Sequence, residues 1–378
     1  MKRLTAIAVG VAAVLSAALG FAPKVTASAE TAAAKSGMIV IERTTNRVLL
    51  GENENTPLPM ASLTKIMTAI VAIEHCDDLN ARHKIPKEAV GIEGSSIYLV
   101  EGEELSVREL LYGLMLRSGN DAATALALLT GGSVEGFVKL MNDKAAELGL
   151  ENTKFQNPHG LPAKEHYTSC YDLAMISSYA MKNELFRQIV GTKSIKISNT
   201  TKDYDRVLKN KNKMLWEYEG GCGIKTGYTK EAGRCLVSAA ERGDMKLICV
   251  VLNCGPMWEV SKQRMEECFN RYEFRNILCA GQLDKSIAVT GGLAERAGVY
   301  LKEDITLLVE KDAELEVEFD LPESLPAPLV RDQEVGEVRI FCEKELLFSQ
   351  KIYNIEGIEV QTQKIFEKIF GNWSLLCG

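Results

Sequence analysis

The sequence predicts a layered α/β domain, followed by a small all-β domain and a terminal amphipathic helix. Strand-like apolar runs stand at both ends of residues 37–254, with helical patterns between them. This order is typical of a sheet whose faces are covered by helices. From about residue 284, short alternating runs replace the helical period, and residues 360–378 then return to a helical spacing of apolar residues.

The first folded domain is predicted to span residues 30–283. Its strands and helices are expected as a hairpin over 37–53, helices over 62–76, 106–129, 134–150 and 171–183, strands over 223–229 and 234–254, and a helix at about 260–280. The strands are apolar runs separated by polar turns, and the helices repeat apolar residues three and four apart. Ser106 with Glu109 forms a capping box for the second helix, and Gly149 closes the third.

The small all-β domain is predicted over residues 284–357. Its alternating runs are 286–292, 305–310, 315–322, 337–343 and 351–357. Pro322, Pro326 and Pro328 interrupt the runs, as prolines do at strand ends and sheet edges.

Residues 358–378 are predicted to form an amphipathic helix. One apolar stripe contains Ile365, Phe366, Ile369, Phe370, Trp373 and Leu376. The segment is too short and too polar to span a membrane, but such a stripe suits a helix lying in the membrane interface. Packing of the stripe on the β-domain is the alternative.

The N-terminus has the pattern of a signal peptide. Lys2 and Arg3 precede an almost unbroken apolar run from Leu4 to Ala22, and residues 27–29 read Ala-Ser-Ala. We therefore predict a signal peptide over residues 1–29, cleaved before Glu30, and an exported protein of the cell envelope. An uncleaved membrane anchor is the alternative, because the apolar run is long.

Charge and composition exclude some partners. The 378 residues are 46% hydrophobic and 25% charged, as in ordinary globular proteins, and their formal net charge is −7. The first 29 residues are basic, so the remainder is more acidic than the whole. Nucleic acid requires a basic face, so we predict no nucleic-acid partner.

The ten cysteines show no CxxC pair and no regular spacing. Several lie in apolar strand-like runs, where a thiol packs as a small hydrophobe. We therefore expect mostly free, buried thiols with one or two disulfides at most, although disulfides are common in exported proteins. The close-set ligand pairs of a zinc site are missing, so no metal is predicted. Cys222 and Cys235, which flank one strand, could crosslink, modulate a site or simply pack.

Residues 60–67, MASLTKIM, place a serine and a lysine three residues apart at the start of an apolar helix. Ser62 and Lys65 share a helix face, so the amine can reach the hydroxyl. A lysine whose pKa is lowered by burial and by cationic neighbours can take the proton from a serine. Taken alone, the pattern also fits a capping serine beside a solvated lysine.

Two further motifs favour the chemical interpretation. Ser118-Gly119-Asn120 is the only S-x-N in the chain, and Lys225-Thr226-Gly227 is the only KTG. A break in a long helix and an exposed strand end would explain them separately. Their occurrence together, in order and each in a fitting context, favours a single site.

SxxK, SxN and KTG in this order are the hallmark of penicillin-binding proteins and serine β-lactamases. The chain most resembles the serine-type D-Ala-D-Ala carboxypeptidases, the low-molecular-mass penicillin-binding proteins. Beyond the three motifs, the resemblance includes FQNPHGLP, the small β-domain and the amphipathic terminal helix, and it covers nearly the whole chain. It implies a β-lactamase/transpeptidase-like α/β sandwich, in which helices flank an antiparallel sheet.

The resemblance also implies roles for the first two motifs. Ser62 would be the nucleophile that attacks the carbonyl between the two terminal D-alanines of a peptidoglycan stem peptide. Lys65 would be the general base, and Ser118 would relay the proton to the leaving D-alanine. Asn120 would hold the substrate backbone and Lys65. No cofactor and no metal are implied.

The third motif would bind the substrate. Lys225 would keep the general base neutral and, with Thr226, receive the terminal carboxylate. Gly227 would let the strand approach the substrate closely. The backbone N–H groups of Tyr228 and of the nucleophilic serine would form the oxyanion hole. β-Lactam antibiotics would acylate the serine and leave slowly, and the enzyme would act in cell wall biogenesis at the outer face of the cytoplasmic membrane, held there by its C-terminal helix.

Two other functions share these motifs. A serine β-lactamase needs a carboxylate that positions the deacylating water, usually within E-x-x-L-N, and that segment is missing from the sequence. Glu165 is the nearest candidate, in a loop of the wrong pattern. A non-catalytic penicillin-binding envelope protein is the second alternative, but it would have no need of Lys65 or Lys225.

A histidine-based site is not favoured. The chain has four histidines, at positions 75, 83, 159 and 166. His159 falls in the family-like segment NPHGLP, where we expect it to shape a loop beside the site. Asp172 is expected to cap the helix that follows it.

Overall fold

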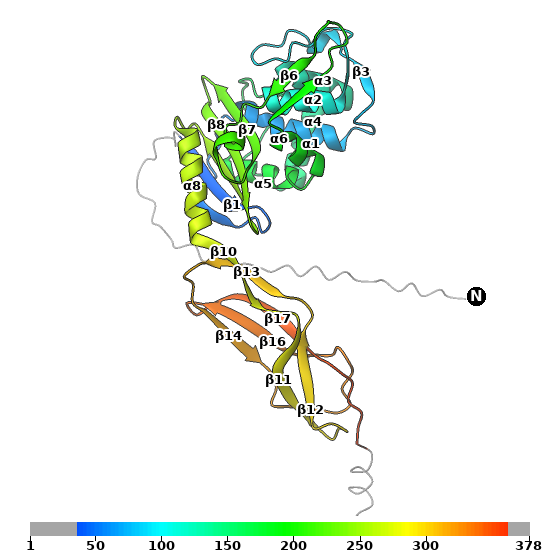
Figure 1. Ribbon diagram of the computed structural model, residues 1–378, viewed down its shortest axis with the longest axis vertical. Helices are drawn as coiled ribbons and strands as arrows, with labels where there is room; N and C mark the ends of the chain where they lie inside the picture. The colour runs from blue at the N-terminus through cyan, green and yellow to red at the C-terminus, as the bar shows by residue number, and fades with distance from the viewer. Residues whose placement is uncertain (1–35, 362–378) are drawn as a thin grey trace, which may run out of the picture. The chain divides into compact units, whose positions relative to one another are not determined.

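The structure is a computed structural model that describes residues 36–361 (Figure 1). The predicted signal peptide and most of the predicted terminal helix lie outside these residues. Ile358 and Val360, at the start of that helix prediction, instead form isolated β-bridges with Leu329 and Gly292. Within residues 36–361, no helix is both long and apolar enough to cross a membrane.

The first domain is built on a five-stranded sheet with the strand order β2-β1-β9-β8-β7. Its strands are β1 (Gly37–Glu42), β2 (Val48–Glu52), β7 (Gly221–Thr229), β8 (Gly233–Arg242) and β9 (Met245–Leu252), and all neighbouring pairs are antiparallel. The N-terminal hairpin β1–β2 therefore shares one sheet with β7, β8 and β9, which come last in the sequence of the sheet. β7 lies at an edge, so the backbone of its outer side is unpaired within the sheet.

Both faces of this sheet are buried. Along β1, Ile39 and Ile41 pack with the larger helical layer, whereas Met38 and Val40 pack with the opposite layer. Successive side chains of a strand point to opposite faces, so a continuous apolar run is what a doubly covered strand requires. Figure 1 shows α8 (Met257–Arg271) on one side of the sheet and helices that include α1 (Lys65–Glu74) and α5 (Cys170–Ala180) on the other.

In the sequence, the remaining elements of this domain come between β2 and β7. They are η1 (Ala61–Thr64), β3 (Arg82–Lys84), η2 (Lys87–Ala89), β4 (Glu104–Ser106), α2 (Val107–Tyr112), η3 (Gly113–Arg117), α3 (Asn120–Gly131), α4 (Val134–Glu147), α6 (Glu184–Gly191), β5 (Ser194–Ile197), β6 (Arg206–Lys209) and α7 (Met214–Glu217). The predicted capping box of Ser106 and Glu109 is confirmed. Gly149 follows α4 with a φ of +69°, in the left-handed region that favours glycine.

Three predicted helices differ from the structure. The first begins with the 3₁₀ turn η1, and the α-helix starts only at Lys65. The predicted helix over 106–129 is two helices, α2 and α3, separated by the π-helical turn η3 and a left-handed Ser118. The predicted helix at 260–280 ends at Arg271, because residues 272–278 form a strand that pairs with β13 (Ile305–Glu310).

The second domain is all-β. A six-stranded sheet has the order β14-β16-β17-β12-β11-β15, and β10 (Tyr272–Leu278) pairs with β13 in a second, two-stranded sheet. The larger sheet consists of β11 (Gly281–Thr290), β12 (Arg296–Leu301), β14 (Leu315–Asp320), β15 (Ser324–Pro326), β16 (Glu334–Cys342) and β17 (Glu345–Asn354). A separate core that includes Val299, Ile340 and Ile352 holds this domain together.

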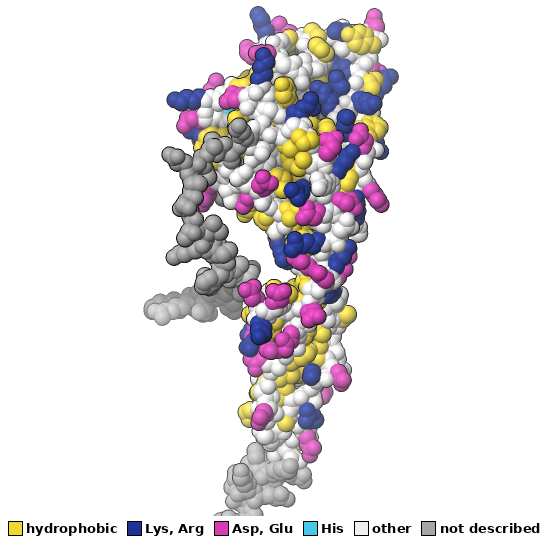
Figure 2. Space-filling view, turned by 90° about the vertical axis from the view of Figure 1, so that its left-hand side faces the viewer, with side chains coloured by type: hydrophobic (Ala, Val, Ile, Leu, Met, Phe, Trp, Pro, Cys, Tyr) yellow, Lys and Arg dark blue, Asp and Glu magenta, His cyan; other side chains and the backbone are white. Residues whose placement is uncertain are grey.

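The surface carries both signs of charge. Figure 2 shows Lys and Arg side chains intermixed with Asp and Glu side chains over the face in view. The nine cysteines among residues 36–361 are all free thiols. Cys235 is fully buried and Cys222 is partly buried, so both pack within the domain rather than crosslink.

Candidate active site

The nucleophile candidate stands at the junction of a turn and a helix. Ser62 belongs to the 3₁₀ turn η1, and Lys65 is the first residue of α1. The Nζ atom of Lys65 lies 3.0 Å from Ser62 Oγ. The three-residue spacing therefore brings the two groups together as predicted, although the helix that does so is 3₁₀ at this point.

Lys65 has the surroundings of a neutral base. Its side chain is fully buried, and its Nζ also donates to Asn120 Oδ1 at 2.7 Å and to the backbone oxygen of His159. A neutral amine has two N–H groups and one lone pair. Two donated hydrogen bonds thus leave the lone pair free to accept from the Ser62 hydroxyl.

Burial is the main reason why the pKa of Lys65 lies well below its usual value. The positive charge of Lys225 lowers the pKa further, whereas Asp121 acts in the opposite direction. The Asp121 carboxylate is engaged elsewhere, since it accepts hydrogen bonds from Ser96 Oγ and from the backbone N–H groups of Ile97 and Leu99.

Ser118 and Asn120 are placed by the break between α2 and α3. Ser118 has a φ of +64°, a left-handed conformation that is uncommon for a non-glycine residue. It ends the π-helical turn, and turns of this kind often occur at functional sites. Asn120 begins α3 and bridges two parts of the site, because its Nδ2 donates to the backbone oxygen of Glu93 while its Oδ1 accepts from Lys65.

The KTG segment lies on the edge strand β7. Lys225 is 2% exposed, and burial, followed by the charge of Lys211, lowers its pKa to about 7. Its Nζ donates to the backbone oxygen of Thr226 at 2.9 Å. A Cβ at Gly227 would lie 3.1 Å from the backbone oxygen of Met60 and 3.2 Å from the nitrogen of Ser62. The glycine therefore permits the close approach of β7 to the nucleophile.

A cavity of about 460 Å³ opens over these groups. It is lined by Ser62, Ser95, Ser118, Lys211, Thr226, Gly227, Tyr228, Arg234, Met257 and Trp258. Five of the eight predicted site residues line it directly. The other three, Lys65, Asn120 and Lys225, are buried, and the contacts above connect Lys65 and Asn120 to Ser62.

The structure adds residues that the motifs did not indicate. Lys211 lies between β6 and α7, and its Nζ is 3.4 Å from Ser95 Oγ. Burial, followed by the charge of Arg117, lowers its pKa. Arg234, at the start of β8, and Trp258, at the start of α8, line the same cavity. Only tertiary contacts reveal these positions, although the lysine-rich run at 209–213 is visible in the sequence.

The two loop histidines, His159 and His166, contact residues of the loop and of the η1 turn. His159 contributes its backbone oxygen to Lys65, and its ring Nδ1 accepts from the N–H of Leu161. His166 contacts Thr64 Oγ1 at 2.8 Å. Burial lowers the pKa of both rings to about 4, so both are neutral near pH 7.

The structure gives the contacts of two carboxylates that the sequence singled out, Asp172 and Glu165. Asp172 is structural, but it does not cap the helix: Ser169 caps α5, and the Asp172 carboxylate accepts from the Asn152 N–H and the Thr153 hydroxyl. Glu165 pairs with Lys154 at 3.2 Å and is not among the residues that line the cavity.

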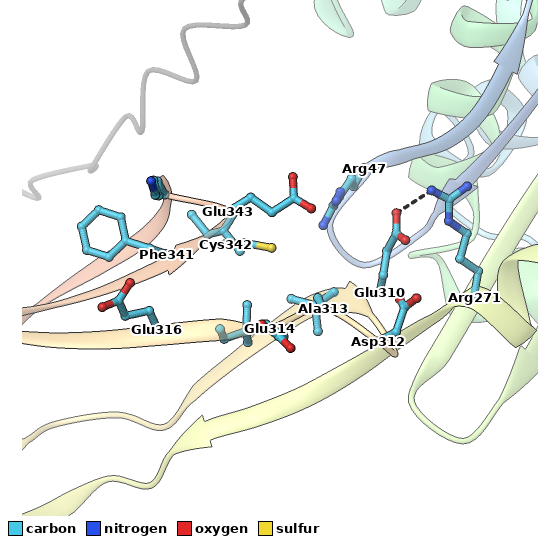
Figure 3. Close-up of a pocket in the computed structure, with 14 residues that line it drawn as sticks. Arg47, Arg271, Glu310, Asp312, Ala313, Glu314, Glu316, Phe341, Cys342 and Glu343 are labelled. Carbon is cyan, nitrogen blue, oxygen red and sulfur yellow. Dashed lines mark hydrogen bonds and ion pairs between the residues drawn. The ribbon is translucent and has the colours of Figure 1, made fainter.

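A larger cavity, of about 860 Å³, lies away from this chemistry (Figure 3). Its lining includes five acidic residues, namely Glu310, Asp312, Glu314, Glu316 and Glu343. Figure 3 shows the ion pair between Arg271 and Glu310 at its edge, with a distance of 2.6 Å. It contains none of the motif residues, and a cluster of carboxylates alone does not identify a ligand.

Sequence comparisons identify the family of the chain. The profile of the family described as D-alanyl-D-alanine carboxypeptidase matches residues 23–255, and that of the Penicillin-binding protein 5, C-terminal domain, matches residues 272–360. The D-alanyl-D-alanine carboxypeptidase DacF of Bacillus subtilis (strain 168) is 33% identical over 358 residues, which are 92% of each chain. DacA of Escherichia coli (strain K12) is 32% identical over 351 residues, covering 88% of this chain and 85% of the relative.

Solved structures show the same fold. The D-alanyl-D-alanine carboxypeptidase DacD from Francisella tularensis superposes with a TM-score of 0.69 at 26% identity, covering 89% of this chain and 95% of the other. Penicillin binding protein 5 from Haemophilus influenzae gives a TM-score of 0.68 at 27% identity, covering 88% and 99%. The predicted α/β domain, the all-β domain and the family resemblance are thereby confirmed, whereas the terminal helix stays a prediction. The chain belongs to the D-alanyl-D-alanine carboxypeptidase family, the low-molecular-mass penicillin-binding proteins.

Proposed function

We propose that this carboxypeptidase removes the terminal D-alanine of peptidoglycan stem peptides through an acyl-enzyme on Ser62. The observation that carries the proposal is the buried Lys65 amine, 3.0 Å from Ser62 Oγ and held by two further acceptors. Burial depresses the pKa of this amine and so favours its neutral form, which has a free lone pair. Such a base within hydrogen-bond reach is what activates a serine as a nucleophile.

In acylation, the Ser62 hydroxyl proton moves to Lys65 Nζ as Oγ attacks the carbonyl between the two D-alanines. The oxyanion that forms is stabilised by the backbone N–H groups of Ser62 and Tyr228. Ser118 then passes a proton to the amine of the leaving D-alanine, which departs as the C–N bond breaks. Water attacks the ester in the second step, releases the shortened peptide and restores the Ser62 hydroxyl.

The terminal carboxylate would lie at the Thr226 side of the nucleophile. Lys225 is buried with its Nζ bonded to the backbone oxygen of Thr226, and Lys211 lines the cavity, so two lysines are near this position. Asn120, which already donates to Glu93 and accepts from Lys65, would fix the side of the cavity where the peptide backbone lies.

The test measures D-alanine release and labelling by a fluorescent penicillin in one preparation. The purified protein is expected to release D-alanine from a peptide ending in D-Ala-D-Ala and to form a covalent penicillin adduct, whereas Ser62→Ala does neither. Labelling without D-alanine release would favour a non-catalytic penicillin-binding protein. Rapid turnover of the penicillin would favour a β-lactamase, a function for which Glu165 is poorly placed because it pairs with Lys154.

We also propose that the protein acts at the outer face of the cytoplasmic membrane, held by residues 358–378. The amphipathic stripe of Ile365, Phe366, Ile369, Phe370, Trp373 and Leu376 supports this location. Truncation at Val360 is expected to move the protein from the membrane fraction to the soluble fraction. Unchanged fractionation would mean that the stripe packs on the β-domain or that the N-terminal segment remains as an anchor.

A further inference from the structure

The charges that line the active-site cavity are of one sign. Its ten lining residues include two cations, Lys211 and Arg234, and no Asp or Glu. Two further lysines, Lys65 and Lys225, are buried and approach the cavity through their neighbours. The chain as a whole carries a net charge of −7, so this local excess of positive charge runs against its composition. A cavity lined in this way favours a substrate with more than one negative charge.

The two lining cations come from different elements. Lys211 follows β6, contacts Ser95, and lowers the pKa of Lys225, so it lies on the Thr226 side. Arg234 is on β8, directly opposite Tyr228 in the antiparallel pair. Thr226 and Tyr228 are two residues apart on β7, and side chains at this spacing share one face of a strand. The cations therefore approach successive positions along the edge strand.

Arg234 is available to a ligand. It is exposed, and within residues 36–361 its guanidinium has no ion pair and no side-chain hydrogen bond. Its backbone is held in the β7–β8 pair, and its carbonyl oxygen accepts from the N–H of Cys254. Glu231 and Glu259 are close in sequence to the lining residues Arg234 and Trp258, but they do not line the cavity. An unpaired guanidinium in a cavity is a ready partner for a carboxylate, which it can bind in a bidentate manner.

The surroundings of Arg234 have the form of a side-chain subsite. Tyr228 is 65% exposed opposite it, while Met257 and the half-buried Trp258 contribute apolar surface from the first turn of α8. A stem peptide whose terminal carboxylate lies near Thr226 and whose scissile carbonyl meets Tyr228 N–H would continue past Tyr228. Its upstream residues would therefore reach Arg234 and Trp258.

From this geometry we infer that Arg234, with Trp258 and Tyr228, forms a carboxylate subsite for the part of the stem peptide upstream of D-Ala-D-Ala. This inference rests on the proposed function and names the substrate class: stem peptides that keep a free upstream carboxylate. Two positions could supply that group, the side chain of a diamino diacid at the third residue and the α-carboxylate of a γ-linked glutamate at the second. Amidation of whichever carboxylate Arg234 binds would remove the anionic partner of Arg234.

The test compares four synthetic pentapeptides that end in D-Ala-D-Ala. One keeps both upstream carboxylates, two carry a single amide at one or the other position, and one carries both amides. The wild-type protein is expected to cleave the free form with a kcat/KM about tenfold above that of the form amidated at the recognised position, the size of one charge-assisted hydrogen-bonded pair. Arg234→Gln is expected to bring this ratio close to one, mainly by raising KM for the free form.

Controls separate this inference from folding and from the proposed function. The Tm of Arg234→Gln, measured beside that of the wild type, shows whether this variant is folded, and Lys230→Gln, an exposed cation outside the cavity lining, should preserve the wild-type ratio. A wild-type ratio near one at both positions, or a ratio that survives Arg234→Gln, would overturn the subsite. Failure to release D-alanine from any of the peptides would instead overturn the proposed function.

Discussion

Gly227→Ala tests whether the distance between β7 and the nucleophile limits acylation. The added Cβ would lie 3.1 Å from the backbone oxygen of Met60, 3.2 Å from the backbone nitrogen of Ser62 and 3.3 Å from the Cβ of Ala61. The first two atoms belong to the main chain and cannot turn away as a flexible side chain could. The strand or the η1 turn must therefore move by a few tenths of an ångström.

The expected loss of rate follows from this displacement. A misplacement of 1 Å near reacting groups costs roughly a hundredfold, so a shift of a few tenths of an ångström is expected to slow acylation by about threefold to tenfold. The loss of stability should be small. Overpacking costs about 1–3 kcal/mol, and the reduced entropy of the unfolded chain returns about 0.4–1 kcal/mol when glycine becomes alanine.

The assay is the second-order rate of labelling by a fluorescent penicillin, measured beside the Tm. Gly191→Ala is the matched control, because its Cβ would make one ordinary contact of 3.6 Å with the backbone oxygen of Cys222. That variant should label at the wild-type rate. If Gly227→Ala also labels at the wild-type rate while remaining folded, the close approach of β7 does not position the reacting groups, and the reasoning fails.

Two further predictions concern buried charges. Lys225→Gln removes a cation that lowers the pKa of Lys65, and the pKa of Lys65 should therefore rise. The acidic limb of the pH profile of the acylation rate should then move to higher pH. A limb that stays in place or moves to lower pH contradicts this prediction. Glu103 is fully buried against Arg206, which is 9% exposed and also donates to the backbone oxygens of Ile97 and Tyr98. Glu103→Gln should lower the free energy of unfolding by about 3–5 kcal/mol in urea denaturation, and a loss below about 1 kcal/mol would show that the pair contributes little.

The sequence predicted which motif side chains meet better than it predicted the local backbone. The three motifs could be read because each is short and its spacing alone determines which groups can meet. The break in the helix at Ser118 could not be predicted, because residues 107–131 keep a helical spacing of apolar residues through the π-helical turn. The chain after Ser118, whose φ is left-handed, makes tertiary contacts, among them the bond from Asn120 Nδ2 to the backbone oxygen of Glu93, 27 residues earlier. A periodic pattern reports which face is buried and not where the hydrogen-bond ladder changes.

The same limit explains the strand at 272–278 and the lysine at 211. Residues 272–278 continue from α8 without a helix-breaking residue, and they become β10 because they pair with β13, whose partner residues lie 27 to 38 positions later. Lys211 enters the site through contacts with Ser95, which is 116 residues away, and through its own N–H to the backbone oxygen of Leu116. Each of these features depends on a partner distant in the chain, and no local pattern encodes such a partner.

The lysines of the site would affect the basicity of Lys65 differently before and after the substrate binds. In the free protein, burial and Lys225 lower the pKa of Lys65, which favours the neutral amine but also makes it a weaker base. A substrate carboxylate bound near Lys225 would offset that charge, and the pKa of Lys65 would rise as a consequence. The amine would then be available before the substrate binds and more basic once it has bound. The cations that attract the substrate would thus also let its negative charge strengthen the base that takes the proton from Ser62.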